Sequence, residues 1–309
     1  MNIDYGKYSD VHGHIRHSSQ ERGQKEFKQK QRVRKKNGDV MFIAEKNVVS
    51  THPGNSIKNV ATLMQEHDFR RIPVTNAGTG RLEGTAKAMD IIDFLGGGEK
   101  YNIIVKEFKG NFLSAINAPI SRIMAPAVFL DKKASVDDAV QLMLARRTSI
   151  VPIVDDKESR KVLAIVTERD VLPTTDDVGV TVAEVMREEC VTATPGMMLA
   201  DVSKIMVRNK LRRLPVLRED KVAGIVTQFD VLRFLSKGEF KGVQAEENLS
   251  IRVSDIMSAD VVSVNSSQDL GDIIRLIKET NLGGFPVIDR DRLSGIITTM
   301  DVIKHVYQS

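Results

Sequence analysis

The chain lacks tryptophan altogether, and its 309 residues include a single cysteine, Cys190. One cysteine can form neither an internal disulfide nor a cysteine-based zinc cluster. No apolar run approaches the ~18 residues of a membrane span, and the first residues contain no apolar core of a signal peptide. We therefore expect a cytoplasmic protein without a membrane partner.

The sequence also lacks the short motifs of common catalytic sites. It contains no G-x-S-x-G, no Gly-Lys-Ser/Thr phosphate loop, no H-E-x-x-H and no G-x-G-x-x-G. His12, His14 and His17 lie close together, but only Asp10 stands near them as a further ligand, and metal sites need an ordered supporting shell. We predict that the protein is not an enzyme, needs no cofactor and holds no metal.

Positive charge gathers at the N-terminus. Residues 1–38 carry ten Lys/Arg and four Asp/Glu, a net +6, whereas the remaining residues carry 35 and 37, a net −2. Few large apolar residues accompany this charge, so we expect residues 1–38 to form a basic, mobile tail. Seven of its basic residues fall between Lys25 and Lys36. Because such a run can neutralise several phosphates, a nucleic-acid partner stays open.

What the chain does contain is one phrase that occurs four times. It reads RIPV…GTAKAMD, IVPIV…AIVTERD, RLPVL…GIVTQFD and GFPVI…GIITTMD. Each copy contains a proline and ends at an aspartate 17, 18, 15 or 15 residues later. The pairs are Pro73 and Asp90, Pro152 and Asp170, Pro215 and Asp230, and Pro286 and Asp301. Repetition of this kind predicts an array of similar supersecondary units.

Each copy lies within the same order of elements. A β-branched run is followed by a helix with apolar residues at i, i+3, i+4, i+7 spacing, then by two strands joined by a polar turn, and then by a second helix. Ser56, Ser135 and Ser267 are placed to cap the first helix of their repeats, and Pro173 shortens the last helix of the second repeat. The repeats are expected at residues 39–98, 117–173, 180–236 and 251–309, with an additional helix within 99–116.

The prediction is therefore an α/β (α+β) protein built from four β-α-β-β-α repeats. The sheet of a single repeat can be covered on only one face by its own helices. Each repeat should therefore need a partner repeat to bury the other face.

The h-P-h-h…G-h-h-[ST]-x-x-D pattern resembles the cystathionine β-synthase (CBS) domain, across roughly residues 39–309. Four such units in one chain resemble the γ regulatory subunit of AMP-activated protein kinase and its prokaryotic relatives. The resemblance implies that the repeats pair through their sheets into two Bateman modules, residues 39–173 and 174–309, which together form a disc. It also implies adenosine ligands between paired repeats, namely AMP, ADP, ATP or S-adenosylmethionine.

The resemblance assigns a role to each motif position. The aspartate binds ribose hydroxyls, the Ser/Thr three residues earlier helps with ribose or phosphate, and the residues two and three positions before the proline of the paired repeat reach the phosphate. Arginine pairs occupy these last positions in the first and third repeats only; the other repeats have Ser149 and Ile150, and Gly283 and Gly284. Guanidinium suits phosphate because its donors form a planar fork.

Two clefts therefore combine an aspartate with an arginine pair. Cleft A comprises Arg70, Arg71, Thr167 and Asp170, with Ile43, Ala44 and Ile165 beside the adenine. Cleft B comprises Arg212, Arg213, Thr298 and Asp301, with Thr181, Val185, Met186 and Ile296 beside the adenine. The two other clefts, around Lys87 and Asp90 and around Thr227 and Asp230, lack phosphate donors in the paired repeat. We expect them to be weak or empty.

Each assignment also has a purely structural alternative. Thr-x-x-Asp is a helix capping box, adjacent residues of a strand point to opposite faces so that only one arginine of a pair reaches a given cleft, and Val, Ile and Met are ordinary core residues. We favour the ligand interpretation because the arginine pair recurs in alternate repeats, at the position that the resemblance gives to phosphate.

We therefore predict a non-catalytic sensor that binds AMP, ADP or ATP between paired repeats and transmits the bound state to an unidentified protein target, as in energy sensing. The alternatives are a nucleic-acid-binding regulator acting through the basic tail, an S-adenosylmethionine sensor, and an interaction module whose clefts bind nothing. A homodimer stays open.

Overall fold

The structure is a computed structural model that describes residues 39–174 and 177–308. Within these ranges no helix is long and apolar enough to cross a membrane, and no group of three or more His, Cys, Asp or Glu side chains could hold a metal ion. The segment 1–38, on which the nucleic-acid hypothesis rests, lies outside the described residues.

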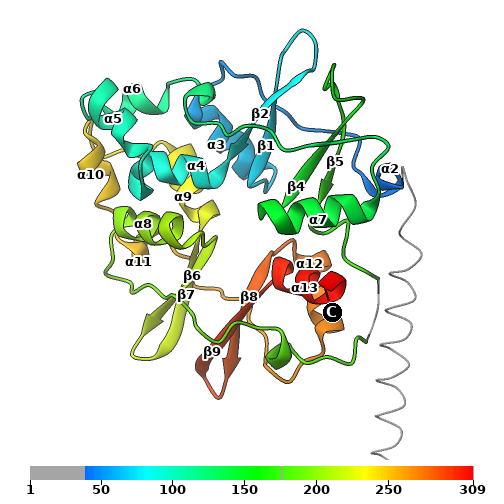
Figure 1. Cartoon of the computed structure of the whole chain (residues 1–309). Coiled ribbons are helices and arrows are strands. Elements are labelled where there is room, and N and C mark those ends of the chain that lie inside the picture. Colours follow the sequence, from blue (N-terminus) through cyan, green and yellow to red (C-terminus); the bar gives the residue numbers. More distant parts are fainter. Residues whose placement is uncertain (1–38, 175–176, 309) are drawn as a thin grey trace, which may run out of the picture.

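Four repeats surround a common centre (Figure 1). The first contains α3 (Ile57–Glu66), β1 (Arg71–Thr75), β2 (Leu82–Lys87) and α4 (Ala88–Ile92), which continues into the π-helical turn η1 (Asp93–Gly97). The second contains β3 (Leu130–Asp131), α7 (Val136–Arg146), β4 (Ile150–Val154) and β5 (Val162–Thr167). The third contains α8 (Leu199–Asn209), β6 (Arg213–Arg218), β7 (Lys221–Thr227) and α9 (Gln228–Lys237). The fourth contains α12 (Leu270–Thr280), β8 (Gly284–Asp289), β9 (Arg292–Thr298) and α13 (Thr299–Gln308).

Shorter elements connect the repeats. They are α2 (Val40–Ile43), α5 (Tyr101–Glu107), α6 (Phe112–Ile116), the 3₁₀ turns η2 (Ile120–Arg122) and η3 (Val182–Glu184), α10 (Ala245–Leu249) and α11 (Val253–Ile256). The predicted additional helix between the first two repeats is confirmed as the two short helices α5 and α6.

All four hairpins share one strand register. The motif proline lies opposite a residue of the second strand in each hairpin, in the pairs Pro73–Thr85, Pro152–Ile165, Pro215–Ile225 and Pro286–Ile296. The register then shifts between the first and second residues after that proline. The repeated phrase therefore encodes a repeated backbone, including its irregularity.

Two kinds of predicted element are reduced or absent in the structure, namely the first strand of a repeat and the second helix of the second repeat. Only the second repeat has a first strand, β3, which pairs in parallel with β4; in the other described repeats it is reduced to one parallel bridge, at Thr51–Val74, Ala193–Val216 and Val264–Val287. The second repeat also forms no second helix, because residues 168–171 make only a turn before Pro173. Proline disfavours helical backbone in the residue before it.

The helix caps follow the prediction in two repeats and depart from it in one. Ser56 accepts a hydrogen bond from the Asn59 amide, and Ser135 forms a capping box with Asp138. The prediction for Ser267 is wrong, because α12 is capped by Asp269. The Asp269 carboxylate also accepts hydrogen bonds from the amides of residues 178 and 179. A contact with the preceding linker therefore fixes where this helix begins.

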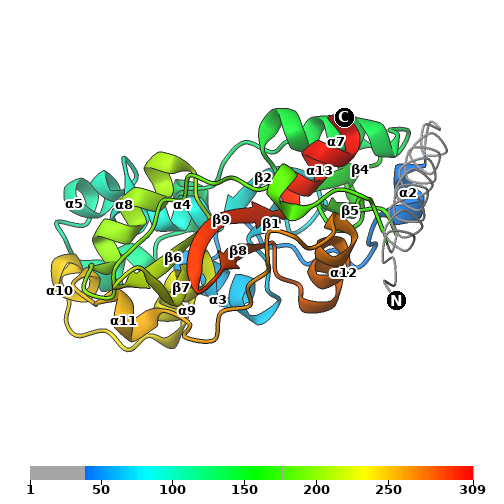
Figure 2. The same ribbon diagram turned by 90° about the horizontal axis from the view of Figure 1, so that it is seen from below.

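The repeats are joined in two directions. The segment at the start of each repeat bridges to the second strand of its neighbour, in the pairs Glu45–Ile165, Thr85–Ala125, Arg187–Ile296 and Ile225–Ser258, which links the first repeat to the second and the third to the fourth. The helices connect different pairs of repeats. One buried core combines residues of the first and third repeats, and a second core combines the second and fourth. The result is a flattened body seen from the side in Figure 2.

Candidate anion-binding site

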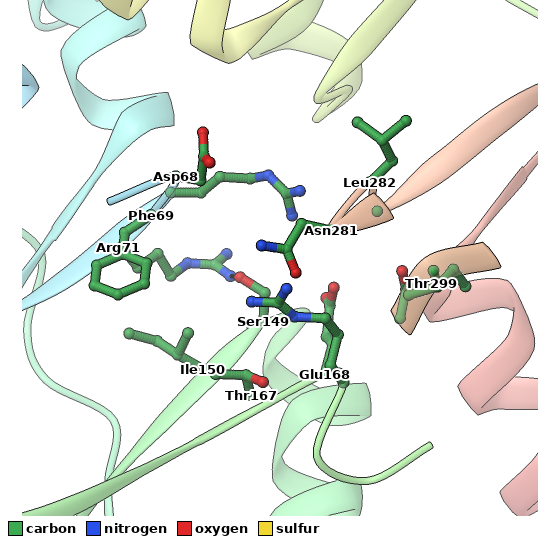
Figure 3. Close-up of a pocket in the computed structure, with 14 residues that line it drawn as sticks. Asp68, Phe69, Arg71, Ser149, Ile150, Thr167, Glu168, Asn281, Leu282 and Thr299 are labelled. Atoms are coloured by element: carbon green, nitrogen blue, oxygen red, sulfur yellow. Dashed lines mark hydrogen bonds between the residues drawn. The ribbon is translucent and has the colours of Figure 1, made fainter. Parts of the chain in front are cut away.

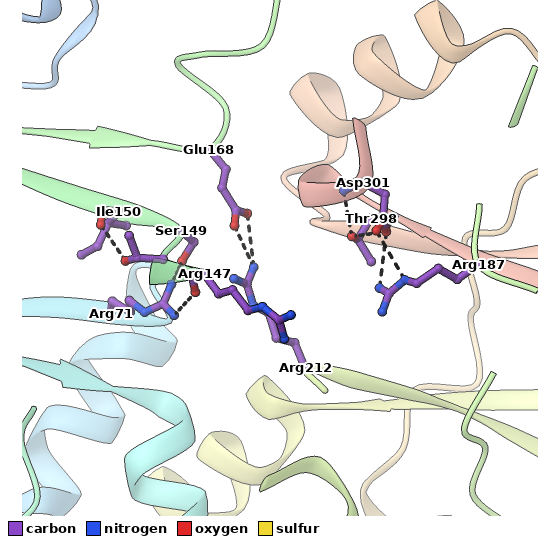
Figure 4. A network of polar contacts seen from close by, with 10 residues as sticks. Arg71, Arg147, Ser149, Ile150, Glu168, Arg187, Arg212, Thr298 and Asp301 are labelled. Carbon is purple, nitrogen blue, oxygen red and sulfur yellow. Dashed lines mark hydrogen bonds and ion pairs between the residues drawn. The ribbon is translucent and has the colours of Figure 1, made fainter. Parts of the chain in front are cut away.

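Both arginine pairs point toward the centre of the molecule. Arg71 donates to the Ser149 hydroxyl and to the Arg147 carbonyl oxygen, the latter at 3.1 Å. Arg212 places its Nη1 atom 3.0 and 3.2 Å from the two carboxylate oxygens of Glu168 (Figure 4). These contacts show that the arginines at the start of β1 and β6 are held by other repeats rather than extended into solvent.

The second arginine of each set is also anchored by a neighbouring repeat. The Arg70 guanidinium lies 5.4 Å from the centre of the Phe229 ring, and Arg213 donates to the Gly284 carbonyl oxygen. Arg212 contacts Glu168 directly, the charges of Arg70, Arg71 and Arg213 also interact with it, and the residue is only 4% exposed.

The electrostatics of this cluster are unbalanced. Burial, together with the charge of Arg212, lowers the pKa of Arg70 to about 10, and burial with the charge of Arg70 lowers the pKa of Arg213 to about 9. Burial would raise the pKa of Glu168, but the charges of Arg212 and Arg70 outweigh it and hold that pKa below its ordinary value. Four guanidinium groups accompany one carboxylate here, so the centre has an excess of positive charge that favours an anion.

The glycine pair of the fourth repeat makes room for this cluster. A Cβ atom at Gly283 would lie 2.9 and 3.0 Å from the guanidinium nitrogens of Arg70, and 3.2 Å from one of Arg213. A Cβ atom at Gly284 would lie 2.7 Å from a backbone oxygen of β9. In the structure Gly283 provides space that the arginines occupy, and Gly284 lets β8 lie close to β9, whereas the sequence pattern suggested only that both positions lack a phosphate donor.

Five of the residues assigned to cleft B line one open cavity of about 1100 Å³, namely Arg212, Arg213, Ile296, Thr298 and Asp301. The Thr298 amide and hydroxyl donate to Asp301 Oδ2, at 2.9 and 2.5 Å, and Arg187 Nε lies 3.3 Å from Asp301 Oδ1. Figure 4 shows this carboxylate on the right, paired with Arg187, and Glu168 paired with Arg212 at the centre. The structure therefore brings the predicted ribose and phosphate groups of cleft B to the same cavity.

Of the four expected adenine contacts of cleft B, Ile296 lines this cavity and the other three do not. Thr181 forms a capping box with Glu184, and Val185 and Met186 pack against the core of the second and fourth repeats. The cavity is lined instead by residues that follow them, Arg187, Glu189, Cys190 and Val191. The residues of this segment that line the cavity thus follow the ones expected from the sequence pattern.

Cleft A is much smaller. Arg70, Arg71 and Thr167 line a cavity of about 70 Å³ together with Ser149 and Glu168 (Figure 3). Ligand pockets are usually about 300–1,000 Å³, so this cavity has no room for a nucleotide.

The other residues assigned to cleft A do not line that cavity. The Asp170 carboxylate accepts hydrogen bonds from the amide and hydroxyl of Thr167, at 2.7 and 2.8 Å. Ile43 and Ala44 pack on the core of the second and fourth repeats, and Ile165 pairs with Glu45.

The two remaining motif aspartates differ from each other. Asp230 is 2% exposed, receives hydrogen bonds from Thr227 and Arg233, and lines neither cavity. Asp90 and Lys87, in contrast, line the same open cavity as cleft B.

The surroundings of Asp90 are not poor in positive charge. Arg71, Arg146 and Arg147 line this cavity as well, contrary to the expectation that Asp90 lacks phosphate donors. Its Oδ1 atom is paired with Lys100 Nζ, and its Oδ2 atom is buried without a hydrogen-bond partner.

Sequence reasoning missed several charged residues of the site. Glu168 directly follows the motif threonine Thr167, and Arg146 and Arg147 end a helix whose apolar face alone was considered. The sequence did contain one indication of Glu168, because a charged residue stands there between an apolar strand and the motif aspartate. Its partner lies in another repeat, however, and only the structure identifies it.

Known proteins resemble the chain over most of its length. The family model described as the CBS domain matches residues 38–97, 120–174, 182–237 and 253–308. The uncharacterised protein MJ1225 of Methanocaldococcus jannaschii is 36% identical over 276 residues, which cover 86% of this chain and 98% of that protein. The crystal structure of MJ1225, proposed there as an archaeal homologue of γ-AMPK, superposes with a TM-score of 0.78 at 33% identity, covering 86% of this chain and 99% of that chain.

Two further similarities are more distant. An inosine-5′-monophosphate dehydrogenase of Staphylococcus saprophyticus is 25% identical over 256 residues, which cover 77% of this chain but only 51% of the enzyme. An uncharacterised conserved protein of Pyrococcus horikoshii shares the fold, with a TM-score of 0.53 at 18% identity over 85% of this chain and 97% of that chain.

Proposed function

Because the chain belongs to the CBS domain family, we propose that it is a non-catalytic regulatory protein that binds an adenine nucleotide in cleft B. The observation that carries the proposal is the shared cavity of Arg212, Arg213, Thr298 and Asp301. Asp301 would accept ribose hydroxyls, and the guanidinium groups would bind phosphate. The similarity to MJ1225, proposed as a homologue of γ-AMPK, supports a sensor rather than an enzyme.

The charges of the site favour phosphate ligands. The positive excess around Glu168 suits AMP, ADP or ATP, whereas the sulfonium of S-adenosylmethionine would add a further positive charge. The cavity of cleft A, at about 70 Å³, is too small for a nucleotide. We therefore propose cleft B as the main site.

A ligand in cleft B would touch the third and fourth repeats together. It would stabilise one arrangement of the two repeats and shift the population toward it by its difference in affinity between arrangements. A protein partner in the cytoplasm would read that arrangement, which would make the protein a sensor of adenine nucleotides and so of energy state.

The test uses two aspartates that hold the same motif position. Calorimetric titration with AMP, ADP and ATP should show binding to the wild-type chain. Asp301→Asn should weaken it by about 10–100-fold, the worth of one hydrogen bond to a charged group. Asp170→Asn is the matched control and should leave the affinity unchanged, because Asp170 does not line the open cavity. Equal affinity of all three proteins, or no binding by the wild type, would contradict the proposal.

A further inference from the structure

Glu168 is an unusual presence in an anion site, because it is itself an anion. It lies in the turn after β5 of the second repeat, is 4% exposed, and contacts Arg212 of the third repeat at 3.0 and 3.2 Å. Arg70 and Arg71 are near enough to hold its pKa low against the effect of burial. The carboxylate therefore occupies the centre of the arginine cluster and partly neutralises it.

Arg212 connects this carboxylate with the open cavity. The same guanidinium lines the cavity of cleft B and forms the ion pair with Glu168. Glu168 lines the small cavity and not the open one. A phosphate that approaches Arg212 from cleft B must therefore share this guanidinium with Glu168 or displace the carboxylate from it.

The cost of that competition depends on the charge of the ligand. Each further phosphate adds negative charge beside a buried carboxylate, where screening by water and salt is weak. Arg70, Arg71 and Arg213 line the open cavity as well and would offer a monophosphate donors other than Arg212, whereas a longer phosphate chain would need more of the cluster.

We propose that Glu168 is a specificity-determining residue, an internal counter-ion that disfavours ligands with more phosphate groups by holding Arg212. The inference rests on the proposed function of cleft B. When a polyphosphate does bind, it takes Arg212 from Glu168 and opens an ion pair between the two modules. Ligand charge is thereby linked to the contact between the second and third repeats.

The experiment compares Glu168→Gln with Glu188→Gln by calorimetry, using AMP, ATP and inorganic tripolyphosphate on the full chain. Glu168→Gln should tighten ATP and tripolyphosphate binding by at least about tenfold, which corresponds to ~1.4 kcal/mol, and AMP binding by less than about threefold. Glu188 is the matched control, since it is an exposed glutamate that lines neither cavity. Its substitution removes one screened charge and should leave the ratio of ATP to AMP affinity unchanged.

The affinity ratio separates this role from a structural one. A carboxylate that only supports the fold would, when removed, weaken all ligands alike or leave their ratio as it was, and either result overturns the proposal. In an Arg212→Met background the effect of Glu168→Gln on the ratio should shrink, because Glu168 acts through Arg212. An undiminished effect there would contradict the mechanism.

Two further measurements address a variant that does not fold and a failure of the proposed function. If Glu168→Gln does not fold, Glu168→Asp should shift the ratio in the same direction, because its shorter side chain holds Arg212 less well; a ratio equal to that of wild type refutes the inference. Tripolyphosphate carries no adenosine and therefore tests the counter-ion role separately from the proposed function. If Glu168→Gln binds tripolyphosphate more tightly than the wild type does, but the wild type binds no adenine nucleotide, the counter-ion role is supported and the proposed function is refuted.

Discussion

Replacing Gly283 by alanine tests whether the arginine cluster is the ligand site. The added Cβ atom would lie 2.9 and 3.0 Å from two nitrogens of Arg70 and 3.2 Å from one of Arg213. Comfortable contacts are about 3.5–4.0 Å, so the guanidinium groups must retreat by roughly 0.5–1 Å. Both are the ends of flexible side chains, and we expect the free energy of unfolding to change by less than about 1 kcal/mol.

The substitution should reduce the affinity for ligand more than it reduces the free energy of unfolding. A charge-assisted hydrogen bond contributes about 1.5–3 kcal/mol, and a displaced guanidinium loses roughly half of it. The affinity for ATP should therefore fall by about 5–10-fold. Calorimetry measures the affinity, and urea denaturation of the same variant measures the stability.

Gly196 provides the matched control for this substitution. A Cβ atom at Gly196 would have no atom within 4 Å, so Gly196→Ala should change neither ATP affinity nor stability. The reasoning is refuted if Gly283→Ala binds ATP as tightly as the wild type. It is also refuted if the loss of affinity is matched by a large loss of folding stability, which would make the glycine a purely structural requirement.

Two further predictions concern stability. Because the pKa of Glu168 is lowered in the folded state, its ion pair stabilises the protein above the ordinary glutamate pKa and loses that effect as pH falls through the folded-state value. Glu168→Gln should therefore lower the free energy of unfolding by about 3–5 kcal/mol at pH 7, as expected for a broken buried pair. The difference from wild type, measured by urea denaturation, should shrink below about pH 4.5. A difference independent of pH would count against an ionised Glu168. Gly97→Ala should lower the free energy of unfolding by about 1–3 kcal/mol. The added Cβ atom would lie 2.5 Å from a methyl group of Val207, where η1 meets α8, and 2.8 Å from the Ile92 backbone oxygen. Thermal and urea unfolding measure it, with Gly196→Ala as the reference, and equal midpoints for the two variants would contradict the close packing of the modules.

Local patterns predicted the elements of each repeat well. The i, i+3, i+4, i+7 spacing in α3 places Ile57, Val60, Ala61 and Met64 on its buried face, and the Thr-x-x-Asp phrase forms a capping box at Thr227 and Asp230. These features depend on residues within about one or two helical turns of each other, so the sequence alone contains what is needed to predict them.

Longer-range effects were predicted less well. Asp269 rather than Ser267 caps α12, because its carboxylate also binds the amides of residues 178 and 179. The adenine-side residues Thr181, Val185 and Met186 lie in a segment whose later residues line the cavity. Which residues of a segment face a cavity depends on how the segment packs against another repeat.

The sequence by itself determined that the chain consists of four similar units, because a phrase repeated with its spacing encodes the same short-range hydrogen bonds and the same buried faces each time. Only the tertiary structure decided where the charges meet. Arg70, Arg212 and Glu168 come from three different repeats, and their approach depends on the packing of sheets in one direction and of helices in the other. No local pattern records that packing, because it arises from contacts between residues far apart along the chain.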